Sequence, residues 1–168
     1  MTRFKFGNLK QKGLYIDETT MRMCYTHRRL LGQTALQLIA EGKKQKAINI
    51  LKKADVEIPT YNVPLDYLNG GIDMARGWLM TGQKAKGKEY VEAIWKNASQ
   101  YLNYYLSLPN DRFLQAEHDC IRQIMIMQSI CEAAGMVSPQ LEKKYEKQLN
   151  NLYRLYHGRG GRMPEGNQ

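Results

Sequence analysis

The chain has 168 residues, a length that fits one domain with a substantial core. Its 25 Lys and Arg against 16 Asp and Glu give a net charge of +9, and seven of the bases lie within residues 1–30 beside only two acids. This excess could meet nucleic acid or anionic lipid, although a solubilising surface is the simpler interpretation. No run approaches the about 18 consecutive apolar residues that cross a bilayer, and the N-terminus lacks the hydrophobic core of a signal peptide.

The first predicted element is irregular. Residues 1–16 lack helical periodicity and are interrupted by Gly7 and Gly13, so we expect an extended or irregular N-terminal segment. Residues 17–20, DETT, then offer side-chain oxygens that can cap the N-terminus of a helix. The apolar spacing that follows predicts a first helix as far as Glu41.

Residues 31–59 contain the pattern around which the rest of the chain is organised. Two apolar stripes at helical spacing are separated by Gly42, and glycine commonly ends a helix in the left-handed conformation. A small residue, Ala47, follows five positions later, and Pro59 forbids continuation of the second helix. The hinge glycine, the packing alanine and the closing proline match the tetratricopeptide repeat, a helical hairpin that needs neighbours to bury its apolar face.

The remainder of the chain predicts four more helices. A linker with two prolines covers 59–64, and helical spacing predicts helices over 65–81, 83–108, 110–134 and 139–157. Gly82 repeats the Gly42 hinge at an offset of 40 residues, but Gly87 stands where the packing alanine would be. The second repeat is therefore degenerate.

Together these elements predict an all-α fold of about six helices in three antiparallel hairpins, arranged as a tetratricopeptide-like right-handed solenoid. The helical-repeat domain covers residues 17–157, between the extended segment 1–16 and a disordered tail over 158–168. Arrays of this kind present a concave groove, and the expected partner is a protein or peptide segment bound in that groove.

The residues show no catalytic constellation. His27, His118 and His157 fall on different predicted helices, and none has a second His or a Cys three or four positions away. No CxxC, phosphate-binding glycine loop or nucleophile-elbow motif occurs. We therefore predict no catalytic, cofactor-binding or metal-binding residues, and no cofactor.

The three cysteines, Cys24, Cys120 and Cys131, are predicted to be buried free thiols. Cys120 and Cys131 would lie about 16 Å apart along one helix, which is too far for a disulfide. Either of them could still reach Cys24. The spacing alone leaves that pairing open.

Partner binding is assigned to aromatic, basic and amide side chains, because exposed aromatic residues beside Lys and Arg suit recognition of a peptide or a sugar. The candidates are Tyr15, Arg22, Tyr25, Arg28, Arg29, Tyr61, Asn62, Tyr67 and Tyr104. Packing against a neighbouring helix would explain the tyrosines about as well. The C-terminal GRGGR resembles an RNA-binding arginine–glycine segment, but with a single copy nucleic acid is not the expected partner.

Residues 4–23, FKFGNLKQKGLYIDETTMRM, resemble the junction that follows the membrane region in a family of large bacterial multipass proteins. That family is common in Bacteroidetes, has no known function and is related to protein O-mannosyltransferases, membrane glycosyltransferases that use lipid-linked sugars. The similarity continues over residues 36–59, in 61–64 (YNVP) with Tyr67, and in 102–108 (LNYYLSL).

The resemblance implies that the chain is the soluble C-terminal part of such a protein, or a stand-alone relative, and that transferase chemistry lies in the membrane portion. The domain would then lie on the periplasmic face of the inner membrane, joined to the upstream membrane domain of the same polypeptide. It would bind acceptor protein or a partner subunit without catalysing a reaction itself. If it is free-standing, the expected location is the cytoplasm, and the alternative function is a tetratricopeptide-like adaptor or a weak RNA-binding protein.

Overall fold

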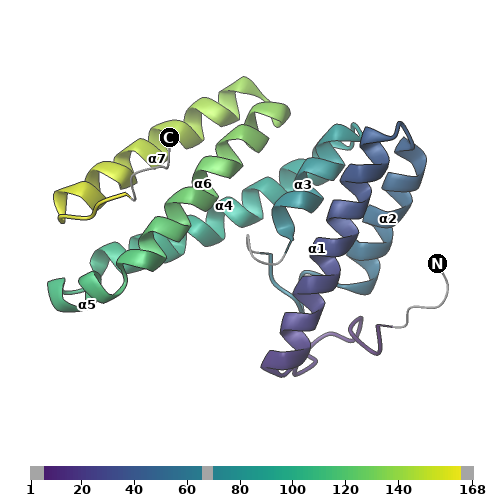
Figure 1. The fold of residues 1–168 in the computed structure, drawn as a ribbon, viewed down its shortest axis with the longest axis horizontal. Coiled ribbons are helices and arrows are strands. Elements are labelled where there is room, and N and C mark those ends of the chain that lie inside the picture. The colour runs from purple at the N-terminus through teal and green to yellow at the C-terminus, as the bar shows by residue number, and fades with distance from the viewer. Residues whose placement is uncertain (1–5, 66–69, 164–168) are drawn as a thin grey trace. The chain divides into compact units, whose positions relative to one another are not determined.

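The computed structural model describes residues 6–65 and 70–163, and all regular structure in these ranges is helical (Figure 1). The helices are α1 (Glu18–Ala40), α2 (Lys44–Glu57), α3 (Gly71–Met80), α4 (Lys84–Ser107), α5 (Asn110–Gln115), α6 (Glu117–Val137) and α7 (Pro139–Gly158). The chain divides into two compact units, residues 1–94 and residues 95–168, and the division falls inside α4. The all-α class is confirmed, although the described ranges hold seven helices in place of about six.

The additional helix arises because the predicted fifth helix is divided at Ala116. α5 ends with Gln115, and α6 begins with Glu117. The amide of Ala116 donates to the carbonyls of both Arg112 and Phe113, at 3.1 and 3.0 Å, so the last turn of α5 is tightened before α6 begins. No glycine or proline marks this position, and the sequence pattern therefore did not reveal the break.

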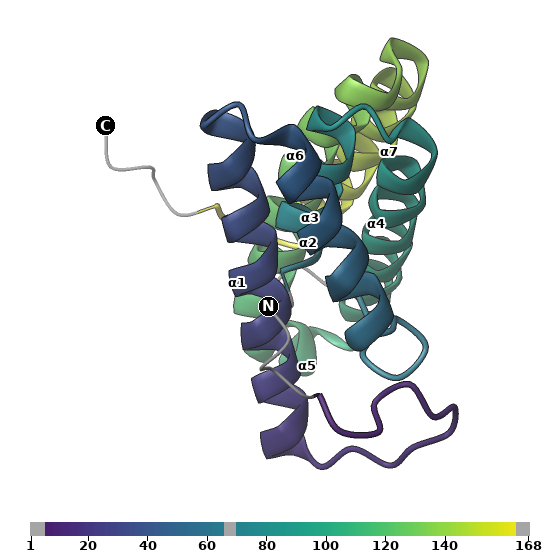
Figure 2. The same cartoon turned by 90° about the vertical axis from the view of Figure 1, so that its right-hand side faces the viewer.

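α1 begins where the sequence predicts. The carboxylate of Asp17 accepts hydrogen bonds from the amide and the hydroxyl of Thr20, at 3.0 and 2.6 Å. These bonds favour the ionised carboxylate and lower the pKa of Asp17. In the first unit, α1 packs against both α2 and α3, and Figure 2 shows the three helices side by side. A Cβ on Gly32 of α1 would lie 2.8 Å from the Cβ of Asp73, which shows how closely α1 and α3 approach.

Gly42 and Gly82 end their helices with the same geometry. Both have left-handed φ angles, of 73° and 82°. At each glycine the amide donates to the carbonyl three residues earlier, at 2.9 Å, and the next amide donates to the carbonyl five residues earlier, at 2.8 or 2.9 Å. The predicted hinge at Gly82 is therefore present. A Cβ on Gly87 would lie 2.5 Å from the side chain of Leu79, so α3 and α4 approach too closely for an alanine at that position.

The beginning of the predicted third helix, residues 66–69, lies outside the described residues, and α3 itself begins at Gly71. Of the extended and irregular forms that the sequence allows, residues 6–16 adopt the irregular one. Gly7 and Gly13 adopt left-handed φ angles of 61° and 74°, and the chain turns repeatedly between them. These turns bring the side chain of Leu9 into a buried cluster of the first unit.

In the second unit, α6 and α7 pack against each other, and Ser138 caps α7. Its hydroxyl accepts from the amide of Leu141 at 3.2 Å, and Pro139 occupies the first helical position. The buried face of α7 consists of Tyr145, Leu149, Leu152 and Tyr156.

Part of the predicted disordered tail makes defined contacts in the second unit. The guanidinium of Arg159 lies over the ring of Phe113, 4.4 Å from its centroid. The amide of Arg162 donates to the carboxylate of Glu117 at 3.1 Å. Residues 164–168 lie outside the described ranges.

Candidate functional site

Four of the predicted partner-binding residues lie at one junction in the first unit. Residues 6–16, the first half of α1 and residues 58–65 meet around a buried cluster of Leu9, Cys24, Ile58 and Val63. Tyr25 packs against this cluster, while Arg28, Tyr61 and Asn62 form hydrogen bonds between its three segments. The junction is therefore held together by residues that the sequence pattern predicts to bind a partner.

Arg28 is a structural residue, in contrast to the surface role that we expected. Its side chain is 1% exposed, and burial lowers the pKa of its guanidinium. The guanidinium donates to the carbonyl oxygens of Ile58, Val63 and Pro64, at 3.1, 2.6 and 2.8 Å. The Ile58 carbonyl belongs to the C-cap of α2, so Arg28 fixes both the end of this helix and the linker after it. These donors are not available to a partner.

Asn62 and Tyr61 hold the N-terminal segment in place. The Asn62 amide nitrogen donates to the carbonyls of Leu9 and Gln11, at 2.7 and 2.6 Å. The Tyr61 hydroxyl donates to the carbonyl of Lys10 at 2.7 Å, although its side chain is 54% exposed. The first two residues of the YNVP linker therefore hold residues 9–11 against the linker.

The remaining candidates divide between the two units. Tyr15, Arg22 and Arg29 are exposed in the first unit, where Arg22 pairs with the glutamate one turn before it at 2.6 Å. Tyr104 is exposed but belongs to the second unit, and Tyr67 lies outside the described residues. The nine positions thus have unequal roles, and no common groove is assigned to them.

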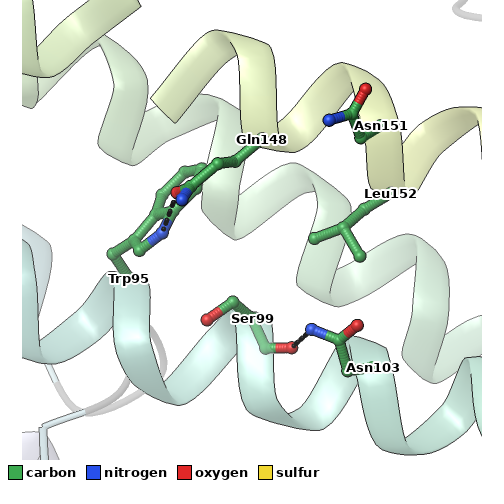
Figure 3. Close-up of a pocket in the computed structure, with 6 residues that line it drawn as sticks. All are labelled: Trp95, Ser99, Asn103, Gln148, Asn151 and Leu152. Carbon is green, nitrogen blue, oxygen red and sulfur yellow. Dashed lines mark hydrogen bonds between the residues drawn. The ribbon is translucent and has the colours of Figure 1, made fainter. Parts of the chain in front are cut away.

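Within the second unit, a hollow of about 320 Å³ opens between α4 and α7 (Figure 3). Its lining consists of Trp95, Ser99 and Asn103 from α4, and Gln148, Asn151 and Leu152 from α7. The three α4 residues are four positions apart, which places them along one face of that helix. Every lining side chain is uncharged, so the chemistry of this hollow is that of amides, a hydroxyl and an apolar floor.

The floor of the α4–α7 hollow is fixed by aromatic packing. The indole of Trp95 stacks on the ring of Tyr145, with centroids 3.9 Å apart and planes 3° from parallel. The indole N–H donates to Oε1 of Gln148 at 3.2 Å (Figure 3). Trp95 and Leu152 are only 7% and 9% exposed. The apolar groups therefore form a packed base, and the amides form the accessible rim.

The rim amides present hydrogen-bonding groups of both kinds. Asn103 donates through Nδ2 to the carbonyl of Ser99 at 2.7 Å, which leaves its Oδ1 as an acceptor. Gln148 and Asn151 each accept a hydrogen bond through their side-chain oxygen, which leaves both NH₂ groups as donors. Among the described residues, Oδ1 of Asn103 and the NH₂ groups of Gln148 and Asn151 have no further hydrogen-bond partner. The hollow thus offers one acceptor from α4 and two donors from α7.

Sequence reasoning missed this hollow. The available signal was the four-residue spacing of Trp95, Ser99 and Asn103, together with Gln148 and Asn151 beside the apolar stripe of the last helix. Only the packing of α4 near α7 shows that these two polar edges line the same space.

The thiols are free and buried, as predicted. Burial raises the pKa of Cys24 and raises the pKa values of Cys120 and Cys131 to about 11. These shifts disfavour the thiolate and make all three poor nucleophiles. Among residues 6–65 and 70–163, no group of three or more His, Cys, Asp or Glu side chains is placed to hold a metal ion.

Comparisons of the chain with models of known families, with curated proteins and with solved structures returned no match. The similarity to the junction of multipass glycosyltransferase relatives therefore stays a prediction from the sequence. In the described ranges, no helix combines the length and the apolar character that crossing a bilayer requires.

Proposed function

We propose that this protein is a non-catalytic helical-repeat interaction domain, in which hairpins of the tetratricopeptide kind present a surface to an extended segment of another polypeptide. The shared capping geometry of Gly42 and Gly82 supports the repeat. The observation that carries the binding function is the amide-rimmed hollow between α4 and α7.

The rim of the hollow suits a polypeptide backbone. Each residue of an extended segment offers one N–H donor and one carbonyl acceptor. Oδ1 of Asn103 can accept from such an N–H, while the NH₂ groups of Gln148 and Asn151 can donate to carbonyl oxygens. Because the rim carries no charge, the segment that fits best has uncharged side chains where it crosses the hollow.

A sugar is a poorer fit for the same hollow. Carbohydrate recognition needs an accessible aromatic face on which a sugar ring can stack. One face of Trp95 is covered by Tyr145, and the whole tryptophan is only 7% exposed. The aromatic group in this hollow therefore supports the floor and is not available as a stacking platform.

The test uses an array of uncharged peptides of about twelve residues and the full chain as the probe. Substituting Asn103→Ala and Asn151→Ala together should weaken binding of captured peptides by about tenfold, since each lost hydrogen bond contributes about 0.5–1.5 kcal/mol. The matched control is Gln100→Ala with Asn150→Ala, two exposed neighbours on the same helices that do not line the hollow. Failure to capture any peptide, or equal weakening in both variants, would contradict the proposal.

The setting of the domain is a second part of the proposal. The sequence similarity of residues 4–23 supports a place beside a membrane-embedded glycosyltransferase, on the periplasmic face, where the segment bound would belong to an acceptor protein or a partner subunit. The genomic sequence upstream of Met1 tests this setting. A reading frame that continues through many apolar stretches would support it, whereas an independent start site would favour the free-standing cytosolic adaptor.

A further inference from the structure

A second surface lies at one end of the first unit and shares no residue with the hollow. α1 and α2 are joined through Gly42, and α3 and α4 are joined through Gly82. Both turns lie at the same end of the unit in Figures 1 and 2. The ammonium group of Lys44 lies 3.7 Å from the point where a Cβ on Gly82 would stand, so the two turns are neighbours in space.

These two turns concentrate positive charge. Residues 41–46 and 82–88 contain six lysines against the single acid Glu41, a net charge of +5 in thirteen positions. We define the lysine tip by these six residues: Lys43, Lys44, Lys46, Lys84, Lys86 and Lys88. More than half of the excess charge of the chain is therefore carried by two adjacent turns.

Within the described ranges, three of the six lysines of the tip form salt bridges and the other three do not. Lys43 forms a salt bridge with Glu41 at 2.7 Å. Lys86 forms salt bridges with Asp55 at 3.5 Å and with Glu89 at 3.0 Å. Lys88 forms a salt bridge with Glu92 at 3.7 Å. Lys44, Lys46 and Lys84 are exposed, and no salt bridge to them is recorded within residues 6–65 and 70–163. Self-repulsion among these three opposes their clustering, and a polyanionic partner would relieve it.

We propose that the lysine tip binds the anionic surface of a lipid bilayer. The tip consists of lysines only, and a lysine ammonium is a compact hydrated point charge that suits diffuse attraction to a layer of headgroups. Nucleic-acid surfaces add arginine forks or aromatic stacking platforms to their positive charge. Residues 41–46 and 82–88 contain no arginine and no aromatic residue, and the nearby ring of Tyr90 is buried at 1% exposure.

The proposal concerns contact with a membrane surface through charge alone, and it is independent of peptide binding by the second unit. Its dependence on salt follows from the same physics, because exposed charges separated by more than about 10 Å are screened at about 0.1 M salt. Binding should therefore be strong at low ionic strength and largely lost at about 0.5 M salt.

The experiment measures co-sedimentation of the full chain with vesicles. Vesicles of phosphatidylcholine with about one third phosphatidylglycerol should bind the protein, and vesicles of phosphatidylcholine alone should not. The triple variant Lys44→Glu, Lys46→Glu, Lys84→Glu should lower binding to the anionic vesicles at least about tenfold. Far-ultraviolet circular dichroism checks that the variant keeps its helices.

A charge-matched control separates the lysine tip from the overall charge of the protein. The variant Lys143→Glu, Lys144→Glu, Lys147→Glu changes the net charge equally, through three exposed lysines of α7. It should keep most of the vesicle binding. Equal loss in both variants, or no binding of the unmodified protein to anionic vesicles, would overturn the proposal.

The same proteins are tested against a single-stranded oligonucleotide. The unmodified protein could bind the oligonucleotide more tightly than the anionic vesicles and lose that binding in the Lys44/Lys46/Lys84 variant. That result would assign the tip to nucleic acid and would also overturn the proposal. Peptide capture by the α4–α7 hollow is measured separately, so either function can fail without the other.

Discussion

The guanidinium of Arg28 lies among three backbone carbonyl oxygens, at 2.6 to 3.1 Å, with 1% of the side chain exposed. A buried cation is tolerated when its donors are satisfied, and here they are satisfied by the end of α2 and the linker after it. The residue that looks from the sequence like a surface charge therefore determines how residues 58–64 fold back on α1.

Replacing this cation leaves the linker carbonyls without donors. We expect Arg28→Met to lower the free energy of unfolding by at least about 3 kcal/mol, because hydrogen bonds to charged groups contribute about 1.5–3 kcal/mol each and the buried carbonyls lose their partners. Urea unfolding followed by circular dichroism measures the change. Arg29→Met, at the exposed neighbouring position, is the control and should change stability by less than about 1 kcal/mol.

Asp17 gives the N-terminus of α1 a dependence on pH. Its folded pKa lies below the unfolded value because the carboxylate accepts two hydrogen bonds from Thr20. The stabilisation is therefore present above the unfolded pKa of 3.8 and is lost as the pH falls through the lower, folded value. The Asp17→Asn variant keeps a capping side chain that does not titrate. As the pH is lowered below about 4, the melting temperature of this variant should therefore fall less steeply than that of the unmodified protein. Asp111→Asn is the control, and an equal flattening there would refute the assignment.

At the scale of elements, the glycines set the distances between helices. Gly87 is the position where the second hairpin departs from the repeat pattern, and a Cβ there would lie 2.5 Å from the side chain of Leu79 and 3.3 Å from its amide nitrogen. The degeneracy that the sequence shows therefore has a packing cause. α3 and α4 approach more closely than an alanine would allow.

Gly87→Ala should destabilise the first unit even though alanine favours a helix. Forcing a methyl group into a packed contact costs about 1–3 kcal/mol, against a gain of roughly 0.5–1 kcal/mol in helix propensity. The expected result is a lower melting temperature by circular dichroism. Gly158→Ala, where a Cβ would meet nothing within 4 Å, should be neutral or stabilising. A higher melting temperature for Gly87→Ala would show that Leu79 can move aside.

Local signals in the sequence predict the elements well, and signals that depend on three-dimensional contacts are the ones that were missed. The Asp17 and Ser138 caps and the Gly42 and Gly82 hinges are each encoded within a few residues, and all four are present. The break at Ala116 has no local marker of that kind. The turned form of residues 7–13 likewise depends on Asn62, more than fifty residues later.

The candidate site shows the same limit. Exposed tyrosines and arginines were chosen as binding residues because of their type, yet burial decides which of them are available. Arg28 is buried, and Asn62 uses its amide nitrogen on the backbone of residues 9 and 11. The α4–α7 hollow needs two helices that are about fifty residues apart in the chain to lie together, which helical periodicity alone does not predict.

At the scale of the whole molecule, the two proposed surfaces belong to different units. The lysine tip is built from the turns around Gly42 and Gly82 in the first unit, whereas the amide-rimmed hollow lies entirely within residues 95–168. A chain with this division can contact a membrane surface through one unit and a polypeptide through the other. Substitutions in one unit should then leave the other function unchanged, apart from effects on folding.

The buried thiols report on the two units separately. Cys24 lies in the first unit, and Cys120 and Cys131 lie in the second. A buried thiol reacts only when its surroundings open, and stability within one protein differs between cooperative units. Labelling by an alkylating reagent, read at each cysteine by peptide mass spectrometry, therefore measures the opening of each unit in the same sample.

Arg28→Met should accelerate the labelling of Cys24 by about tenfold or more, because it weakens the junction against which this thiol is buried. The labelling rates of Cys120 and Cys131 should stay within about twofold of those in the unmodified protein, since their surroundings belong to the second unit. Leu149→Ala, which removes a buried side chain of α7, should give the reverse pattern. If either substitution accelerates all three cysteines equally, the chain opens as one cooperative body, and α4 transmits stability across the boundary at residue 94.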